Sequence, residues 1–168
     1  MYEERCGNDF MAQPKTNAMR FLDSRHIDYE VYTYENKDGK IDGISVANKI
    51  NKDIAIVYKT LVVKGTGSDV YVFIVPVGEE LDLKKAAKAV KEKKVEMVAV
   101  KDIQKLTGYI RGGCSPLGMK KKYETIIADS AEKISSIIVS GGKIGIQMEL
   151  KVADLKAATE AHFANITH

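Results

Sequence analysis

Lys59 is the residue whose chemistry contrasts most with its surroundings. It interrupts VYKTLVV (57–63), a run of β-branched and aromatic residues that is typical of a buried strand. Side chains alternate across a strand, so Lys59 shares a face with Val57 and Val63. If this face packs into the core, the ammonium must be paired or lose its charge, and both conditions are common at functional sites. Alternatively, Lys59 lies at a sheet edge, with its stem over the apolar surface and its ammonium in solvent.

A glycine-rich stretch, TGYIRGGCSPLGMKKK (107–122), is the second candidate for chemistry. Glycines let backbone N–H groups approach a ligand closely, as in an anion nest or an oxyanion hole. The stretch contains neither GxxxxGK[ST] nor GxGxxG, so it is not a known phosphate loop. The alternative is a long connection without a function of its own.

Cys114 lies in this stretch and raises the question of a cysteine nucleophile. The three histidines that could activate a thiol, His26, His162 and His168, are far from it in sequence, so we do not expect Cys114 to be catalytic. The other cysteine is Cys6, and neither belongs to a CxxC or a His/Cys cluster. We therefore expect no metal and no cofactor.

The charge of the chain is modest, with a formal net value of +3 at pH 7. Lysines cluster at KEKK (91–94) and at KKK (120–122), and such clusters are usually solvated surfaces. The second cluster directly follows the glycine-rich stretch, where lysines could also meet phosphate groups.

Local patterns predict the elements that position these residues. Thr16 is suited to cap a helix through NAMRFLDSR (17–25), and Asp82 one through LKKAAKAV (83–90). Gly108 is placed to end a helix over 100–107. Periodicity predicts two further helices, over 44–50 and 152–163, and strands over 29–35, 57–63, 69–77, 124–129, 134–140 and 143–150. Strands 57–63 and 69–77 form a hairpin. The last two strands are joined at Gly141 and Gly142. The irregular order of strands and helices indicates a mixed α/β sheet.

Length and composition indicate an ordinary globular protein. The chain has 168 residues, 45% of them hydrophobic and 29% charged, which fits one domain over 14–168 after a poorly ordered leader over 1–13. The sequence has no apolar stretch long enough for a membrane span and no apolar block typical of a signal peptide. We expect a cytoplasmic protein with no membrane partner.

Six segments together resemble the YbaK/EbsC family of aminoacyl-tRNA deacylases, which are similar to the editing insertion domain of bacterial prolyl-tRNA synthetase. They are KTNAMRFLDSRHIDYEVYTYE, VYKTLVV, LDLKKAAKAVKEKKVEM, TGYIRGGCSPLG, YETIIAD and SGGKIGIQMEL. The resemblance implies a mixed, mainly antiparallel sheet curled into a partial barrel, with helices packed outside. It also implies removal of a wrong amino acid, above all cysteine, from proline tRNA.

The resemblance assigns roles to residues of this chain. It implies that Lys59 and Gly112 are the catalytic positions. It implies substrate contacts for these residues: Tyr34, Thr60, Tyr109, Gly113, Ser115, Pro116, Ser140 and Gly141. In this family the thiol of the substrate is thought to attack its own ester, which would leave Lys59 to hold the ribose or phosphate. The expected partners are aminoacylated proline tRNA and prolyl-tRNA synthetase.

The sequence departs from the family pattern at several positions, which leaves the substrate open. Ile144 stands where an arginine is common, Gln147 where an acidic residue is common, and Asp42 and Tyr32 where a phenylalanine and a histidine are usual. Removal of alanine from Ala-tRNA(Pro) is one alternative, and a weakly catalytic tRNA-binding module acting with prolyl-tRNA synthetase is another. An esterase acting on small acyl groups is disfavoured, because the chain has no GxSxG elbow and no Ser-His-Asp order.

Overall fold

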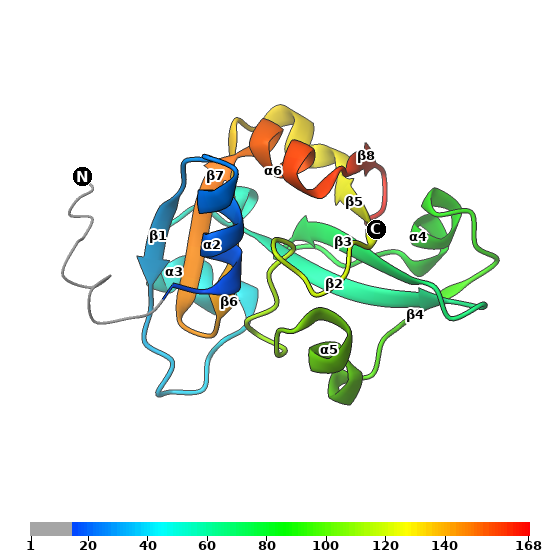
Figure 1. Cartoon of the computed structure of the whole chain (residues 1–168), viewed down its shortest axis with the longest axis horizontal. Coiled ribbons are helices and arrows are strands. Elements are labelled where there is room, and N and C mark those ends of the chain that lie inside the picture. Colours follow the sequence, from blue (N-terminus) through cyan, green and yellow to red (C-terminus); the bar gives the residue numbers. More distant parts are fainter. Residues whose placement is uncertain (1–14) are drawn as a thin grey trace.

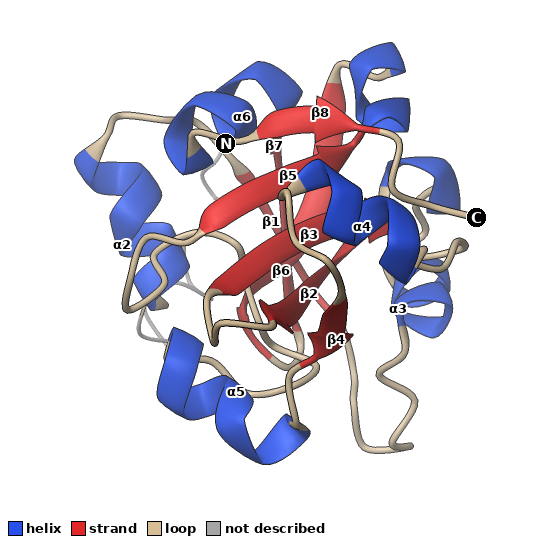
Figure 2. Ribbon diagram, turned by 90° about the vertical axis from the view of Figure 1, so that its right-hand side faces the viewer, coloured by secondary structure: helices blue, strands red, loops and turns tan. Residues whose placement is uncertain are grey.

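The computed structural model describes residues 15–168, whose strands form two sheets with helices around them (Figures 1 and 2). The leader expected over 1–13 lies outside the described residues. The mixed α/β architecture predicted from the sequence is confirmed, and the helices lie on the outside as expected. None of the helices within 15–168 is long and apolar enough to cross a membrane.

The two sheets differ in size and in strand direction. The smaller one is antiparallel, in the order β1 (Glu30–Thr33), β7 (Ile146–Lys151) and β6 (Ser136–Lys143). The larger one has the order β4 (Val95–Met97), β2 (Tyr58–Gly65), β3 (Val70–Pro76), β5 (Glu124–Ala128) and β8 (His162–Ala164). Its first three strands pair antiparallel and include the expected β2–β3 hairpin, whereas β3, β5 and β8 run parallel.

The sheets meet where β2 begins. A parallel bridge joins Val57, just before β2, to Ile138 of β6. We expected one sheet curled into a partial barrel, but the described strands form two sheets, and their hydrogen bonds do not close a barrel. The junction between the two sheets is the structural feature that creates the candidate site.

The helices begin and end at residues suited to these positions. Their bounds are α2 (Asn17–Ser24), α3 (Gly43–Lys49), α4 (Leu83–Ala89), α5 (Val100–Thr107) and α6 (Val152–Thr159), with short 3-10 turns η1 (Ile54–Ile56) and η2 (Asp129–Lys133). Thr16 accepts a hydrogen bond from the Met19 N–H, and Asp82 accepts one from Lys84 and one from Lys85, so both predicted caps are confirmed. Gly108 ends α5 with a φ of +88°.

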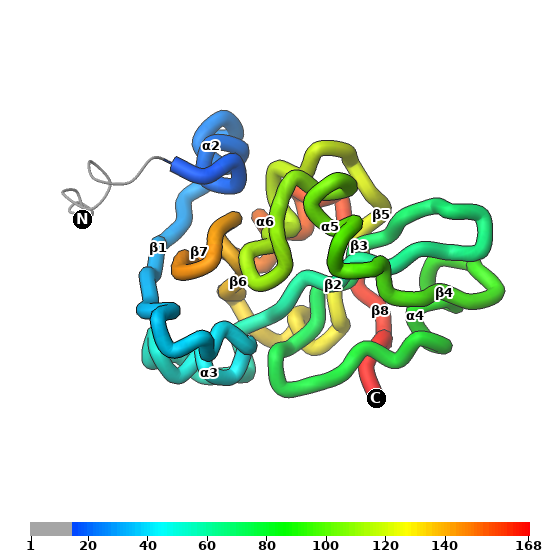
Figure 3. Tube along the Cα trace, turned by 90° about the horizontal axis from the view of Figure 1, so that it is seen from below, coloured from blue at the N-terminus to red at the C-terminus, as the bar shows by residue number. Residues whose placement is uncertain are grey.

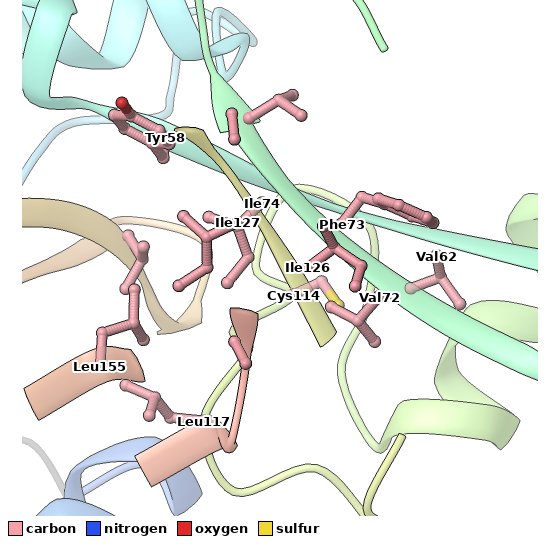
Figure 4. Packing of buried hydrophobic residues seen from close by; sticks show 14 of the residues in the cluster. Tyr58, Val62, Val72, Phe73, Ile74, Cys114, Leu117, Ile126, Ile127 and Leu155 are labelled. Atoms are coloured by element: carbon pink, nitrogen blue, oxygen red, sulfur yellow. The ribbon is translucent and has the colours of Figure 1, made fainter. Parts of the chain in front are cut away.

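The hydrophobic core lies between the larger sheet and the elements that cover it. Phe73 and Ile74 of β3 and Ile126 and Ile127 of β5 are fully buried, and Figure 4 shows them beside Leu117 and Leu155. A second, smaller cluster contains Ala47, Val57, Val77 and Ile138 and packs α3 against the junction of the sheets. Helices α2 and α3 lie on opposite faces of the smaller sheet (Figure 3).

Two connections differ from the sequence prediction. Gly141 and Gly142 do not form the β6–β7 turn: both lie within β6, where the pairing with β7 shifts register between Ser140 and Lys143, and the turn falls at 144–145. The last helix ends at Thr159 rather than at 163, because the chain then forms β8 beside β5. Strands β4 and β8 were not predicted, since three residues carry too little pattern.

Candidate functional site

A cavity of about 110 Å³ lies at the junction of the two sheets. Its walls come from five parts of the chain: the start of β2 with the residue before it, the residue after β3, α3 with the segment before it, the glycine-rich stretch, and the paired strands β6 and β7. The lining residues are Ile41, Gly43, Val46, Val57, Tyr58, Lys59, Thr60, Val77, Gly112, Cys114, Ser140 and Gln147. The cavity is therefore apolar on one side and carries a few polar groups, as small-molecule sites usually do.

Lys59 supplies the charge of this cavity. Strand β4 pairs with β2 only over Val63–Gly65, and Val57 bridges to Ile138 of β6, so Lys59 lies between these two pairings at the edge of β2. The Lys59 side chain is 28% exposed, and its Nζ lies 3.6 Å from Glu80 Oε2. Of the two alternatives, the position at an edge is the closer description, but the side chain also lines the cavity. Its ammonium can therefore meet an anionic ligand.

Thr60 also lines the cavity. Its Oγ1 is buried and has no hydrogen-bond partner among the described residues, although buried hydroxyls are nearly always paired. An unpaired buried hydroxyl costs free energy, and a ligand that reached it would remove this cost. Ser140 also lines the cavity, and its Oγ accepts a hydrogen bond from the Gly142 N–H.

The glycine-rich stretch is held in one conformation by its own side chains. The Tyr109 hydroxyl donates to the Leu117 carbonyl over 2.6 Å, and Ser115 Oγ accepts from the Leu117 N–H. Thr107 Oγ1 accepts from the Tyr109 N–H. These bonds fix the conformation of residues 107–117, so the stretch is an ordered loop and not merely a long connection.

Gly113 lets this loop pack closely on the β6–β7 turn, and Gly112 lies at the cavity itself. A Cβ on Gly113 would lie 2.8 Å from the Ile144 nitrogen, so glycine is needed for the close packing of the loop on the β6–β7 turn. Gly112 has a φ of +87° and lines the cavity. Within residues 15–168, the N–H groups of Gly112 and Cys114 make no hydrogen bond, so the fold uses neither of them.

Four of the ten residues predicted for the site come together at the cavity: Lys59, Thr60, Gly112 and Ser140. The other six lie outside its lining: Tyr34, Tyr109, Gly113, Ser115, Pro116 and Gly141. Tyr109, Gly113, Ser115 and Pro116 are buried in the folded loop, and the Gly141 carbonyl accepts a hydrogen bond from Thr16 Oγ1. The Tyr34 hydroxyl is buried without a partner among the described residues.

Cys114 lines the cavity but has the wrong electrostatics for a nucleophile. Burial raises the pKa of its thiol to about 11, although a contact with Thr107 Oγ1 works in the opposite direction. The thiol is therefore protonated at neutral pH, and thiols attack as thiolates. In addition, no group of three or more His, Cys, Asp or Glu side chains in the described chain is placed to hold a metal ion.

Sequence reasoning missed several residues of the cavity, of which Gln147 and Ile41 are the most informative. Gln147 is 7% exposed and lies opposite Ser140 in the pairing of β6 and β7, so the two side chains share a face. Ile41 Cδ1 lies 2.9 Å from where a Cβ on Gly112 would stand. Gln147 falls on the polar half of the alternation in β7, so the strand pattern does not mark it, and the sequence showed it only as a departure from the family pattern; nothing local marks Ile41.

The sequence and the fold have counterparts in known proteins. Residues 42–158 match the family model of the aminoacyl-tRNA editing domain. A curated protein of Enterococcus faecalis, named "Putative Cys-tRNA(Pro)/Cys-tRNA(Cys) deacylase EbsC", is 44% identical over 155 residues, which cover 92% of this chain and 94% of that protein.

Two solved structures share the fold. One is described as "a putative trans-editing enzyme for prolyl tRNA synthetase", with a TM-score of 0.80, 21% identity, and coverage of 90% of this chain and 95% of that one. The other is a hypothetical protein, with a TM-score of 0.82, 17% identity, and coverage of 90% and 99%. At these identities the likeness concerns the fold alone.

Proposed function

Because this chain belongs to the aminoacyl-tRNA editing domain family of the YbaK/EbsC type, we propose that it removes cysteine from mischarged proline tRNA, Cys-tRNA(Pro). The substrate is suggested by the name of the 44% identical relative. The observation that carries the proposal is the cavity, which Lys59, Thr60 and Gly112 line together.

The size of the cavity fits an aminoacyl group. Its volume of about 110 Å³ is well below the roughly 300–1,000 Å³ of sites for drug-sized ligands. The apolar side chains Ile41, Val46, Val57 and Val77 surround such a group, and the terminal ribose and phosphate stay outside. An apolar wall of this kind separates side chains by only about 1–3 kcal/mol per methylene, so size alone does not select cysteine.

Cysteine can instead be selected by the reactivity of its own thiol. The substrate thiol loses its proton to water, and the thiolate attacks the carbonyl carbon of its own ester. The new S–C bond forms as the C–O bond to the ribose breaks, and the ribose oxygen takes up a proton. The products are free tRNA and a cyclic thiolactone, which water then hydrolyses to cysteine. Alanine and proline have no such nucleophile.

The residues of the cavity then have defined tasks. The N–H of Gly112 donates to the carbonyl oxygen as negative charge develops on it, a contribution of about 3–4 kcal/mol for one well-placed donor. Lys59 holds the ribose or the terminal phosphate, and Thr60 and Ser140 hold the aminoacyl end. Tyr109, Gly113, Ser115, Pro116 and Gly141 act by holding the glycine loop and β6 in place, and Tyr34 offers its hydroxyl beside α3.

One observation favours a second candidate, a weakly catalytic tRNA-binding module that acts with prolyl-tRNA synthetase. Ile144, at the position of the common family arginine, packs toward Gly112 and cannot contact a phosphate. Incubation of catalytic amounts of protein with Cys-tRNA(Pro) and with Ala-tRNA(Pro) decides between the candidates. Multiple turnovers of the cysteinyl substrate support the proposed deacylase. Turnover of the alanyl substrate instead would mean that the protein is a deacylase of Ala-tRNA(Pro). Binding without turnover supports the tRNA-binding module.

A further inference from the structure

Gln147 is a buried polar side chain to which the fold gives no partner. It is 7% exposed and lines the cavity, and its carboxamide makes no hydrogen bond within the described chain. Its carboxamide atoms are not sealed from solvent, as the hydroxyls of Tyr34 and Thr60 are, so they can be reached from the cavity. A ligand that offers an acceptor or a donor can therefore pair with this amide.

The position of Gln147 on β7 fixes where its side chain can act. It pairs with Tyr32 of β1 on one side and with Ser140 of β6 on the other, so these three side chains project from one face of the smaller sheet. That face carries α3, whose Val46 also lines the cavity. Gln147 therefore belongs to the inner wall and not to the open mouth.

The charge of the cavity narrows the choice of ligand group. Among the lining residues Lys59 is the charged one, and the wall contains no carboxylate. Glu80, which faces Lys59, is 82% exposed and does not line the cavity. A space with one cation and no anion favours an anionic group over a cationic one.

On the basis of the proposed function, we propose that Gln147 is a specificity-determining residue whose amide N–H donates a hydrogen bond to the substrate sulfur as it ionises. The amide stabilises a thiolate by a hydrogen bond, and Lys59 stabilises it by its positive charge. Neither group acts as a base toward the substrate. In the reaction Gln147 exchanges no proton. It stabilises the nucleophile in its reactive form, so it acts on a cysteinyl group and gives no advantage to an alanyl one.

The test is the pH dependence of single-turnover deacylation of Cys-tRNA(Pro) by the full chain. The rate rises with pH as the substrate thiol ionises, and we expect an apparent pKa below the value of about 8.5 for a free thiol. Gln147→Glu keeps the shape of the side chain and adds a negative charge. It should raise this apparent pKa by about one unit, so the rate at pH 7 falls about tenfold while the plateau at high pH largely recovers.

A matched control and a second variant complete the experiment. Gln104→Glu makes the same chemical change on the exposed side of α5 and should leave the pH profile in place. Gln147→Leu removes the donor without adding charge and should also raise the apparent pKa, by less than the glutamate does, so the rate at pH 7 falls a few-fold while the plateau is kept. If Gln147→Glu does not fold, as judged by circular dichroism, the leucine variant decides.

The inference and the proposed function fail in different ways. A profile for Gln147→Glu that superimposes on that of the parent, or a leucine variant as fast as the parent, overturns the role of Gln147. A parent protein that does not deacylate Cys-tRNA(Pro) at any pH overturns the proposed function itself.

Discussion

Lys59 Nζ lies 3.6 Å from Glu80 Oε2, although the Glu80 side chain is 82% exposed and that of Lys59 is 28% exposed. An ion pair with one partner in solvent contributes only about 0–1 kcal/mol to stability. The fold therefore depends little on this pair, and the lysine can exchange its partner for an anionic ligand. This separation of stability from function can be tested at Lys59.

Lys59→Ala should fold normally and lose deacylation of Cys-tRNA(Pro) by about a hundredfold or more, because the substrate loses a positioning charge. Lys59→Arg should also be poor, since a planar guanidinium does not replace an ammonium in a confined space. Single-turnover rates and thermal melting give the two readouts. The matched control is Lys64→Ala, which removes an exposed lysine of the same strand. An active Lys59→Ala would leave this lysine without a role in the reaction.

Gly112→Ala should lower both activity and stability. The φ of +87° at Gly112 disfavours any side chain there. A Cβ would also lie 2.9 Å from Ile41 Cδ1, which must shift within the cavity wall. We expect a loss of about 1–2 kcal/mol in the free energy of unfolding, together with a strong loss of turnover.

Gly67→Ala is the control for this change. Gly67 lies in the β2–β3 turn, and a Cβ there would have no atom within 4 Å. Gly67→Ala should shift the melting temperature by no more than a few degrees and should leave the turnover unchanged. Equal effects at both glycines would mean that the Gly112 result reports loop destabilisation in general and not the cavity.

Local signals explain which elements could be predicted from the sequence. The Thr16 and Asp82 caps and the Gly108 terminus act within one helical turn, so neighbouring residues suffice to predict them. Strands β4 and β8 depend on pairing with β2 and β5, which no local pattern reveals. In the β6–β7 connection, Gly142 and Gly145 both adopt positive φ, so the presence of glycine alone does not place the turn.

The candidate site could be predicted only in part for a similar reason. Lys59 contrasts with its neighbours, whereas Gly112, Thr60 and Ser140 were assigned through the family pattern. Val46, Ile41 and Gln147 become site residues only because α3 and β7 are brought to the start of β2. That arrangement follows from how the two sheets meet, which is a property of the whole fold.

The carboxyl group of Glu149 should give the stability a defined pH dependence. Burial works to raise its pKa, but hydrogen bonds from Ser136 and Tyr32 and the charge of Lys52 outweigh it and hold the pKa below the ordinary value. A lowered folded pKa stabilises the fold above the unfolded pKa, and this stabilisation is lost as the pH falls through the folded value.

Glu149→Gln should therefore cost about 1–2 kcal/mol in the free energy of unfolding at pH 7 and flatten the loss of stability on acidification. Urea unfolding at pH 7 and at pH 3 measures both effects. Glu96→Gln, on the exposed edge strand β4, serves as the control and should change little. A difference between parent and Glu149→Gln that stayed constant from pH 7 to pH 3 would contradict this role of the carboxylate.

Binding of proline tRNA should weaken as salt rises, with a slope that corresponds to about two to four phosphate contacts. Within the cluster 120–122, Lys120 Nζ donates to the Lys105 carbonyl and Lys122 pairs with Glu160, whereas Lys121 has no partner in the described chain. Replacing all three by alanine should reduce the slope, and Lys121→Ala alone should account for much of the change. Affinity that did not vary with salt would show that this surface does not bind tRNA.

The identity of the nucleophile can be tested at Cys114. Its pKa of about 11 keeps the thiol protonated at neutral pH, and its Sγ lies 3.9 Å from Thr107 Oγ1. Cys114→Ser should therefore keep the turnover of Cys-tRNA(Pro) within a few-fold, because this side chain forms no bond to the substrate. The stability should respond instead: the raised pKa of the buried thiol lowers parent stability as the pH rises from about 9 to about 11, and the serine variant should lack this loss.

A substrate whose thiol is methylated completes the test, because S-methylation removes the attacking group and leaves the ester, the ribose and the phosphates unchanged. The parent protein should bind this tRNA and release almost no amino acid from it, whereas the unmodified substrate is cleaved in the same assay. An inactive Cys114→Ser together with rapid cleavage of the S-methylated substrate by the parent would mean that the cysteine of the protein attacks. In that case the cavity would have to lower the pKa of Cys114, against the direction in which burial moves it.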